Sequence, residues 1–353
     1  MSSIMTVRGQ LPPDELGNTL PHEHIYWGYS EEVASFRLMN SDKRLWNAPV
    51  SMDILADLKR SSGQCKDNMI LSSYDDAKNE LMRFKQFGGN TIVDCSAPQT
   101  GEGVKALLQI SEATGINVIC GTGWYIEASH PSFVSQNAVS ELTEHIVKEL
   151  IEGIDGTSIR AGVIGEIGCS APLTINEEKV LAAAAKAQAR THAPLTVHPG
   201  YYDYKNRREI RQVRRELDIL QRNDADMFKV YVSHMDDYYN DLGYNERIME
   251  QYGVTLSYDC FGQEQYFDHL FFGAGGITDK ERIATLVELL RKGFEGQLMM
   301  SHDICEKILL RKYGGWGYSH VLEHIVPTLK QNGVSEREIN TMLVGNPRRL
   351  FSR

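Results

Sequence analysis

Short apolar runs alternate with longer amphipathic stretches along almost the whole chain. The runs are rich in β-branched residues, which is typical of strands buried on both faces, and the stretches repeat their apolar positions at helical spacing. The runs occupy residues 19–24, 91–95, 117–121, 161–166, 195–198, 228–234, 254–259 and 297–303. Eight strands that alternate with helices in this way predict an α/β fold, the (β/α)8 TIM barrel.

Helical patterns fill most of the chain between these runs. They cover residues 74–87, 102–114, 137–153, 176–192, 205–222, 241–251 and 278–292, and two more follow before residue 344. The exception is the polar connection after the first run, at about residues 26–73, which we expect to be a loop insertion. Since no repeat and no Pro/Gly/Ser-rich linker interrupts the alternation, we expect residues 1–353 to form a single domain.

The charge balance and the cysteines narrow the class of protein. The net charge is -10 and the sequence pI is about 5.6, which argues against a nucleic-acid-binding surface. No uncharged apolar stretch approaches the roughly 18–20 residues of a membrane helix, and residues 1–13 lack a signal-peptide pattern. Six cysteines occur without a Cys-x-x-Cys pair, which fits free thiols in a reducing compartment. We therefore expect a cytoplasmic protein whose partner is a small-molecule substrate, with homodimer formation left open.

Ionisable side chains stand at the ends of the predicted strands. Such positions line the active-site rim of a TIM barrel, because its parallel strands all end on the same side. His22 and His24 are two residues apart in the first run, so an extended chain points both imidazoles to one face. Later runs end on Glu166, His198, His234, Asp259 and Asp303. Each residue alone has a structural explanation, but together at one rim they indicate a functional site.

These residue types favour a metal centre. Four imidazoles and two carboxylates can hold two divalent cations, with zinc expected first and manganese, cobalt, iron or nickel as alternatives. The expected ligands are His22, His24, Glu166, His198, His234 and Asp303. Asp303 would join the first histidine pair, and Glu166 would bridge the two cations. Such a pair can hold a hydroxide between the ions and polarise a carbonyl or phosphoryl oxygen, while Asp303 accepts the hydroxide's proton.

Several motifs resemble one enzyme family. The Thr-Leu-Pro-His-Glu-His segment at residues 19–24, the Gly-Glu-Ile-Gly run at 165–168, His198, His234 and the Ser-His-Asp run at 301–303 resemble the phosphotriesterase-like branch of the amidohydrolase superfamily. The resemblance covers nearly the whole chain. It implies a TIM barrel of the metal-dependent hydrolase type and the same ligand set.

The resemblance is closest to the phosphotriesterase-related proteins, over residues 155–170 and 312–320. That group includes an N-acetyltaurine amide hydrolase and a relative named as a resiniferatoxin-binding protein. Phosphotriesterases and many lactonases of the family bridge their metals with a carboxylated lysine, where this chain has Glu166. Phosphotriesterases also use a relay histidine one residue after the position of Asp259, where this chain has Cys260. The missing histidine does not favour efficient phosphotriester hydrolysis.

Together these features predict a binuclear metal-dependent hydrolase. In it, a metal-bridging hydroxide attacks the carbonyl of a small amide, ester or lactone, and the resemblance favours an N-acyl amide. Phosphotriester or phosphodiester hydrolysis is the alternative reaction, because two metals serve a phosphoryl centre equally well. A non-catalytic barrel that binds a small molecule is the alternative of another class.

Other residues have weaker signals. Trp124, Tyr125 and Tyr201 lie in loops after the third and fifth strands and are candidates for substrate contact, although ordinary loop packing explains them equally. Asp259 either contacts the substrate or orients a metal ligand. Residues 320–324 match the His-x-x-Glu-His pattern of some zinc peptidases. They fall on the helix after the last strand, in the outer ring of the barrel, so we expect no peptidase site there.

Overall fold

Eight parallel strands form the centre of the computed structural model, which describes residues 2–28, 43–203, 208–266 and 276–353. In sheet order they are β3 (Asn18–Glu23), β6 (Gly89–Asp94), β7 (Asn117–Thr122), β8 (Val163–Gly168), β9 (Leu195–His198), β12 (Val230–Val232), β13 (Thr255–Tyr258) and β14 (Leu298–Met300). The segment after β14 meets β3, where the Asp303 N–H donates to the His22 carbonyl oxygen at 3.2 Å. The predicted (β/α)8 barrel is confirmed.

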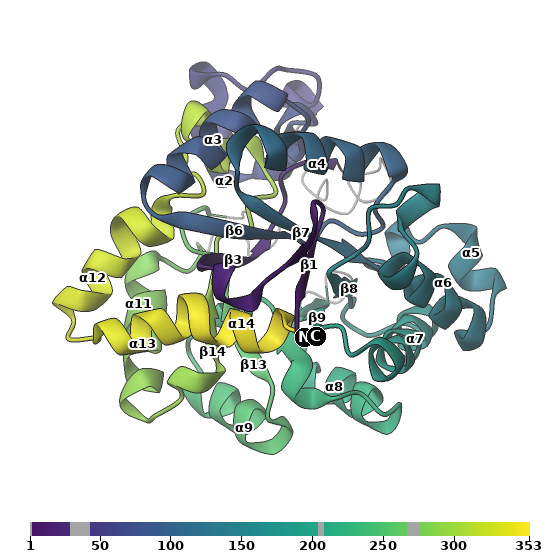
Figure 1. Ribbon diagram of the computed structural model, residues 1–353. Coiled ribbons are helices and arrows are strands. Elements are labelled where there is room, and N and C mark those ends of the chain that lie inside the picture. Colours follow the sequence, from purple (N-terminus) through teal and green to yellow (C-terminus); the bar gives the residue numbers. More distant parts are fainter. Residues whose placement is uncertain (1, 29–42, 204–207, 267–275) are drawn as a thin grey trace.

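Helices surround this barrel, as Figure 1 shows. Those that follow the strands are α3 (Tyr74–Gln86), α4 (Gly101–Thr114), α6 (Val139–Ile151), α7 (Ile175–Thr191), α8 (Val213–Arg222), α9 (Leu242–Tyr252) and α11 (Asp279–Arg291). The chain ends with α12 (Val326–Gln331), α13 (Glu336–Asn340) and α14 (Asn346–Phe351). Among the helices of the described ranges, none combines the length and the apolar character that crossing a membrane requires.

Alternate strand residues face the helices and the barrel interior. Ile92 and Val118 belong to the large core between the strands and the outer helices, whereas Val93 and Ile119 join a separate inner cluster. The inner cluster also contains Ile4, Leu16, Val163, Tyr231, Met299, Leu350 and Phe351. The hairpin of β1 (Ile4–Thr6) and β2 (Gly9–Leu11) lies across one end of the barrel, in the foreground of Figure 1, beside the two labelled chain ends. Because the inner cluster fills the barrel at the end where this hairpin lies, we look for functional polar side chains at the opposite end, where the strands have their C-termini.

One predicted helix is wrong at its start. We expected it at residues 205–222, but Tyr202–Asp203 and Arg208–Glu209 pair as the antiparallel strands β10 and β11, and α8 begins only at Val213. The reason lies in the apolar spacing, since buried residues recur at helical intervals only from Val213 onward. Residues 205–207 of the predicted helix lie outside the described residues.

The long connection after β3 is also more ordered than a plain loop. It contains the short antiparallel pair β4 (Trp27–Gly28) and β5 (Ile70–Leu71) and the helix α2 (Leu55–Arg60). Residues 29–42 of the expected insertion lie outside the described residues. The buried Leu58 and Cys65 of this segment pack on Ile308, which follows β14.

Candidate metal centre

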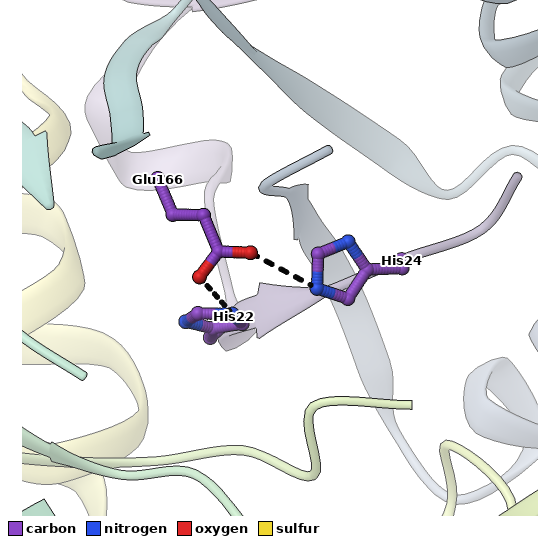
Figure 2. A group of neighbouring side chains, drawn as sticks. All are labelled: His22, His24 and Glu166. Carbon is purple, nitrogen blue, oxygen red and sulfur yellow. Dashed lines mark ion pairs between the residues drawn. The ribbon is translucent and has the colours of Figure 1, made fainter. Parts of the chain in front are cut away.

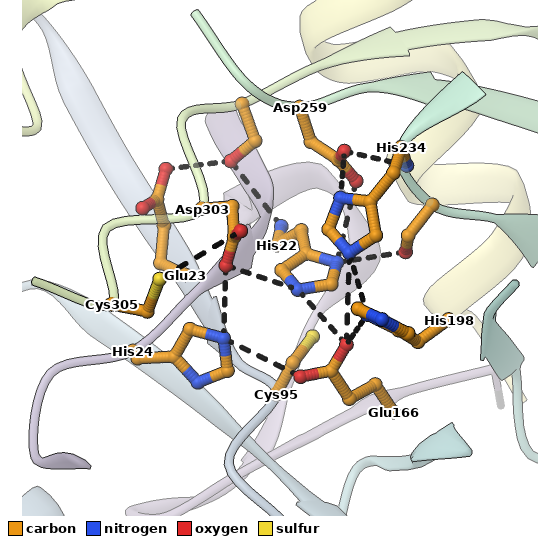
Figure 3. Close-up of polar contacts among 12 residues, drawn as sticks. His22, Glu23, His24, Cys95, Glu166, His198, His234, Asp259, Asp303 and Cys305 are labelled. Carbon is orange, nitrogen blue, oxygen red and sulfur yellow. Dashed lines mark hydrogen bonds and ion pairs between the residues drawn. The ribbon is translucent and has the colours of Figure 1, made fainter. Parts of the chain in front are cut away.

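Ionisable side chains from six strands meet at the C-terminal end of the barrel, and Figure 3 shows them pointing at one another. His22, Glu166 and His198 lie on strands β3, β8 and β9 themselves. The others follow their strands by one to three residues: His24, His234, Asp259 and Asp303. The structure therefore brings together all seven of the rim residues that the sequence predicted.

Glu166 stands at the middle of this group. Its Oε1 atom lies 3.5 Å from His24 Nε2, and its Oε2 atom lies 3.4 Å from His22 Nε2 (Figure 2). On the other side, Oε2 lies 3.1 Å from His198 Nδ1 and 3.9 Å from His234 Nε2. One buried carboxylate thus faces both histidine pairs, which is the placement that a bridging ligand needs.

Two sets of donor atoms share this carboxylate. One set is His22, His24 and Glu166, the other is Glu166, His198 and His234, and within each set the atoms lie within 4.8 Å of one another. Asp303 belongs with the first set, because its Oδ1 atom lies 3.1 Å from His24 Nε2 and 3.6 Å from His22 Nε2.

Serine hydroxyls hold the first histidine pair from behind. The Ser233 hydroxyl lies 2.7 Å from His22 Nδ1, and the Ser96 hydroxyl lies 2.9 Å from His24 Nδ1. Each ring therefore keeps its Nε2 atom directed at Glu166 and Asp303. A hydrogen bond to the rear nitrogen fixes both the orientation and the tautomer of a metal-binding imidazole.

The second histidine pair is held in the same manner. The Tyr125 hydroxyl lies 3.2 Å from His198 Nε2, and Asp259 Oδ1 lies 2.9 Å from His234 Nδ1. Their inner nitrogens, His198 Nδ1 and His234 Nε2, are 2.8 Å apart. Zinc bonds two imidazole nitrogens at about 2.0–2.1 Å each, so atoms this close can serve a single ion.

The backbone is strained where two of these side chains are presented. His234 and Asp303 have φ angles of 56° and 52°, in the left-handed region that few residues other than glycine adopt. Glu23 clamps the second turn: its Oε1 accepts from His302 N at 2.9 Å, and its Oε2 accepts from Ile304 N at 3.0 Å. Asp155, His192 and Asp224 adopt the same backbone conformation outside the site, but only His234 and Asp303 present side chains to it.

Burial and charge oppose each other in this centre. Burial lowers the pKa of His22, but the carboxylates of Glu166, Asp259 and Asp303 outweigh it and raise that pKa to about 9. Burial likewise disfavours the charged form of Glu166, but the neighbouring histidines hold its pKa well below the ordinary value. The cluster is mostly buried, with side-chain exposures of 23% for His198 and 15% for Asp303, and its carboxylates make it an environment that attracts cations.

The residues present fit divalent cations. His22 Nε2 is buried and makes no hydrogen bond within the described part of the chain, although carboxylate oxygens lie on both sides of it. A buried nitrogen without a partner is unfavourable unless it binds something else. Mixed imidazole and carboxylate donors suit zinc and its first-row neighbours.

The remaining predicted residues occupy different places. Asp259 is fully buried behind the histidines, 3.3 Å from His22 Nδ1, so it orients these imidazoles rather than facing a substrate. The ring of Trp124 is 2% exposed and packs on Phe133 and His145 of the outer helices, so its placement does not support substrate contact. Tyr201 packs partly buried on the large core.

The side chains of the His-x-x-Glu-His pattern make structural contacts with other residues and with each other. Glu323 holds the Arg83 guanidinium with both carboxylate oxygens, and His320 Nε2 lies 2.6 Å from Asp279 Oδ2. His320 Nδ1 in turn lies 3.2 Å from His324 Nδ1. Glu323 is therefore paired with an arginine, which does not fit the catalytic role of the glutamate in a zinc peptidase.

Sequence reasoning missed several supporting residues. Ser96 and Ser233 are polar residues next to strand ends, a signal that could have marked them. Gln263, whose amide nitrogen lies 3.2 Å from Asp303 Oδ2, sits in a loop without any motif.

The family is decided by comparison with known proteins. A model of the phosphotriesterase family matches residues 2–351. The chain belongs to the phosphotriesterase family. It is accordingly a hydrolase of this metal-dependent family, in agreement with the resemblance seen in its motifs.

Relatives within the phosphotriesterase family match over their whole length. The N-acetyltaurine hydrolase of Danio rerio is 36% identical over 349 residues, which is 98% of this chain and 97% of that protein. The N-acetyltaurine hydrolase of Homo sapiens is 34% identical, over 98% of this chain and 96% of that protein.

Solved structures of the family show the same fold. The resiniferatoxin-binding protein from Rhodobacter sphaeroides superimposes with a TM-score of 0.89 at 33% identity, covering 99% of this chain and 94% of that one. The phosphotriesterase homology protein from Escherichia coli, solved with phosphate in its active site, has a TM-score of 0.74 at 28% identity. That match covers 96% of this chain and 99% of the Escherichia coli protein.

Proposed function

We propose that this protein hydrolyses a small N-acyl amide at a centre of two divalent cations. The observation that carries the proposal is the position of Glu166, whose two oxygens face both histidine pairs. The relatives named N-acetyltaurine hydrolases support an amide as the substrate. The buried free thiols of all six cysteines support the expected reducing compartment, the cytoplasm.

The two ligand sets support one place for each proposed cation. His22, His24 and Asp303 would hold one, His198 and His234 would hold the other, and Glu166 would touch both. Zinc is the first candidate, with manganese, cobalt, iron and nickel as alternatives. When bound, the cations supply Lewis acidity for the carbonyl oxygen and lower the pKa of water, which makes a nucleophile available near neutral pH.

The chain's own residues manage the proton. The Asp303 carboxylate accepts a proton from the attacking water while a C–O bond forms at the carbonyl carbon. As the C–N bond breaks, Asp303 returns the proton to the amine nitrogen, so the products are a carboxylic acid and an amine. Glu23 and Gln263 hold the Asp303 turn during both transfers.

The surroundings of Asp303 favour an amide over a phosphotriester. In amide hydrolysis, the leaving amine takes up the proton that Asp303 has accepted. In phosphotriester hydrolysis, a phenolate leaves without that proton, so the proton must be carried from Asp303 to solvent. Cys260 is 7% exposed and lies 3.6 Å from His234 Nδ1, at the position where a relay histidine was expected. The neighbouring Asp236 is buried in a 2.7 Å ion pair with Arg282. Cys260 and Asp236 therefore do not form a route that could carry the Asp303 proton to solvent.

The proposal is tested by metal analysis and a substrate panel. The purified protein is assayed for bound metal and for turnover of N-acetyltaurine, N-acetyl amino acids, γ-lactones and an aryl phosphotriester. We expect about two metal equivalents and the highest kcat/KM on an N-acetyl amide. A preference for the phosphotriester would favour the alternative reaction. Full metal occupancy without turnover of any compound would favour a binding protein.

A further inference from the structure

The side-chain amide of Gln263 is joined to Asp303 at two points. Its Nε2 atom lies 2.8 Å from the Asp303 carbonyl oxygen and 3.2 Å from Asp303 Oδ2. The same nitrogen lies 3.0 Å from the His302 carbonyl oxygen. One amide group therefore holds both the backbone and the carboxylate of the residue that would move the proton.

Gln263 is itself held by the loop after β13 and by a helix. Its backbone N–H donates to the Cys260 carbonyl oxygen at 3.1 Å, and its carbonyl oxygen lies 3.5 Å from Arg282 Nη2. Arg282 is 2% exposed and is fixed by Asp236 and Asp279 at 2.7 and 3.2 Å. The Gln263 side chain thus projects from a rigid support, and long amide side chains position a partner well only under that condition.

This contact gives the two oxygens of Asp303 different surroundings. Oδ1 faces His24 and His22, whereas Oδ2 faces Gln263, with the Cys305 thiol at 4.0 Å. Without an amide donor on Oδ2, rotation of the carboxylate could present both oxygens to the histidine side. The left-handed backbone of Asp303, with φ 52°, makes an external support more important at this residue.

We propose that Gln263 is a positioning residue that keeps Asp303 Oδ1 toward His22 and His24 and reserves Oδ2 for the proton. This inference rests on the proposed function for its catalytic consequence. An amide is suited to the role because it donates a hydrogen bond at every working pH and never accepts the proton itself. Its hydrogen bond uses one lone pair of Oδ2, and the other contact of this oxygen within the described part of the chain is the weak one with the Cys305 thiol at 4.0 Å.

The test compares two glutamines of the same loop. Gln263→Met keeps the length of the side chain and removes the donor. Gln265→Met is the matched control, because Gln265 is also buried and donates to a carboxylate, Glu306 Oε2 at 3.3 Å, outside the metal centre. Gln263→Glu is a second variant of unchanged size that places a carboxylate against Asp303.

Two readouts are taken on each full-length protein. The first is the visible absorption of the protein loaded with Co²⁺ alone, which responds to the coordination geometry and needs no substrate. The second is steady-state kinetics on N-acetyltaurine, which gives kcat and KM separately. The melting temperature is recorded for each protein. Loss of a hydrogen bond to a charged group predicts that Gln263→Met lowers kcat roughly ten- to a hundredfold with KM little changed.

We expect both Gln263 variants to bind as much Co²⁺ as the wild type but to show a changed absorption band, while Gln265→Met matches the wild type. Gln263→Glu should lose more activity than Gln263→Met, because two carboxylates repel. If Gln263→Met fails to fold, Gln263→Glu is judged by the same two readouts. A wild-type spectrum and kcat in the folded Gln263 variants would overturn the inference. A wild type that hydrolyses no amide would overturn the proposed function, and the Co²⁺ spectra would still decide the role of Gln263.

Discussion

Asp259 is joined to His234 twice through a single oxygen. Its Oδ1 atom accepts the His234 backbone N–H at 2.7 Å and lies 2.9 Å from the imidazole Nδ1. The carboxylate therefore fixes both the left-handed backbone of His234 and the direction of its ring. Because Asp259 is fully buried, this is a positioning role, and it connects the end of β13 to the histidine that follows the neighbouring strand β12.

Asp259→Asn keeps the shape of the side chain and removes its charge. Partners behind a metal-binding histidine typically contribute about 10–100-fold to metal affinity, so we expect a loss of that size at one of the two metal equivalents. Metal affinity is measured by competition with a coloured chelator. Asp76→Asn is the control, since this buried carboxylate pairs with Lys312 away from the centre. Unchanged affinity in Asp259→Asn would contradict its positioning role.

Glu166→Gln addresses the bridge itself. A neutral amide is a poor metal ligand, and it removes the negative charge that lies between the four imidazoles. We expect loss of at least one metal equivalent and a fall in kcat of about a hundredfold or more. Metal content is read by elemental analysis, with Glu80→Gln as the control for a buried glutamate outside the centre. If Glu166→Gln retained both metals and the full rate, Glu166 would not be the bridge.

Tyr125→Phe separates two roles for this tyrosine. The structure places its hydroxyl 3.2 Å from His198 Nε2, behind a histidine proposed as a metal ligand, whereas the sequence suggested substrate contact. A partner behind His198 predicts weaker metal binding, by about tenfold, with KM little changed. Substrate contact predicts the reverse, a raised KM at unchanged metal affinity. Chelator competition and steady-state kinetics on the same preparation distinguish the two.

The sequence predicted the cluster of rim residues because barrel geometry makes strand ends meet. His22, His198 and Asp303 are far apart in the chain, yet each closes or follows an apolar run, and parallel strands bring those ends to one rim. The supporting residues could not be found in this way. Gln263 lies in a loop whose path no periodicity encodes, and its contact with Asp303 depends on the packing of Arg282.

The direction of a side chain was equally hard to predict. Trp124 and Tyr125 are neighbours in one loop, and the sequence alone gives both the same interpretation, an aromatic residue near the rim of the barrel. The structure directs Trp124 toward the outer helices and Tyr125 toward His198. Adjacent residues point in different directions, so a one-residue difference decides whether a ring packs in the core or lines the site.

Cys260→His tests whether the missing relay limits phosphotriester hydrolysis. We expect less than about a threefold gain on an aryl phosphotriester, because the added imidazole would meet Asp236, which is already paired with Arg282. Combining Cys260→His with Arg282→Met removes the arginine partner of Asp236. We expect the folded double variant to gain more phosphotriester activity than Cys260→His alone. Rates on the phosphotriester are compared with the wild type, and melting temperatures report folding. A large gain from Cys260→His alone would contradict the closed arrangement of Asp236.

Glu216 predicts a dependence of stability on pH. Burial raises the pKa of this carboxyl group to about 8, from 4.5 in the unfolded chain, while Gln212 and the Gly200 N–H hydrogen-bond to its Oε1. Between pH 4.5 and about 8 the folded protein keeps a proton that the unfolded chain has lost. Stability therefore falls as pH rises through this window, by up to about 1.4 kcal/mol per pH unit from this group.

Glu216→Gln removes the titration and preserves the shape of the protonated acid. We expect the melting temperature of the variant to lie closest to that of the wild type near pH 4.5 and to exceed it increasingly toward pH 8. Glu178→Gln on the adjacent helix α7 serves as the control, because its side chain is 37% exposed and pairs with Arg215. Measuring the difference between variant and wild type at each pH cancels the titration of all other groups. A difference that stays constant from pH 5 to 8 would show that Glu216 is already ionised in the folded protein.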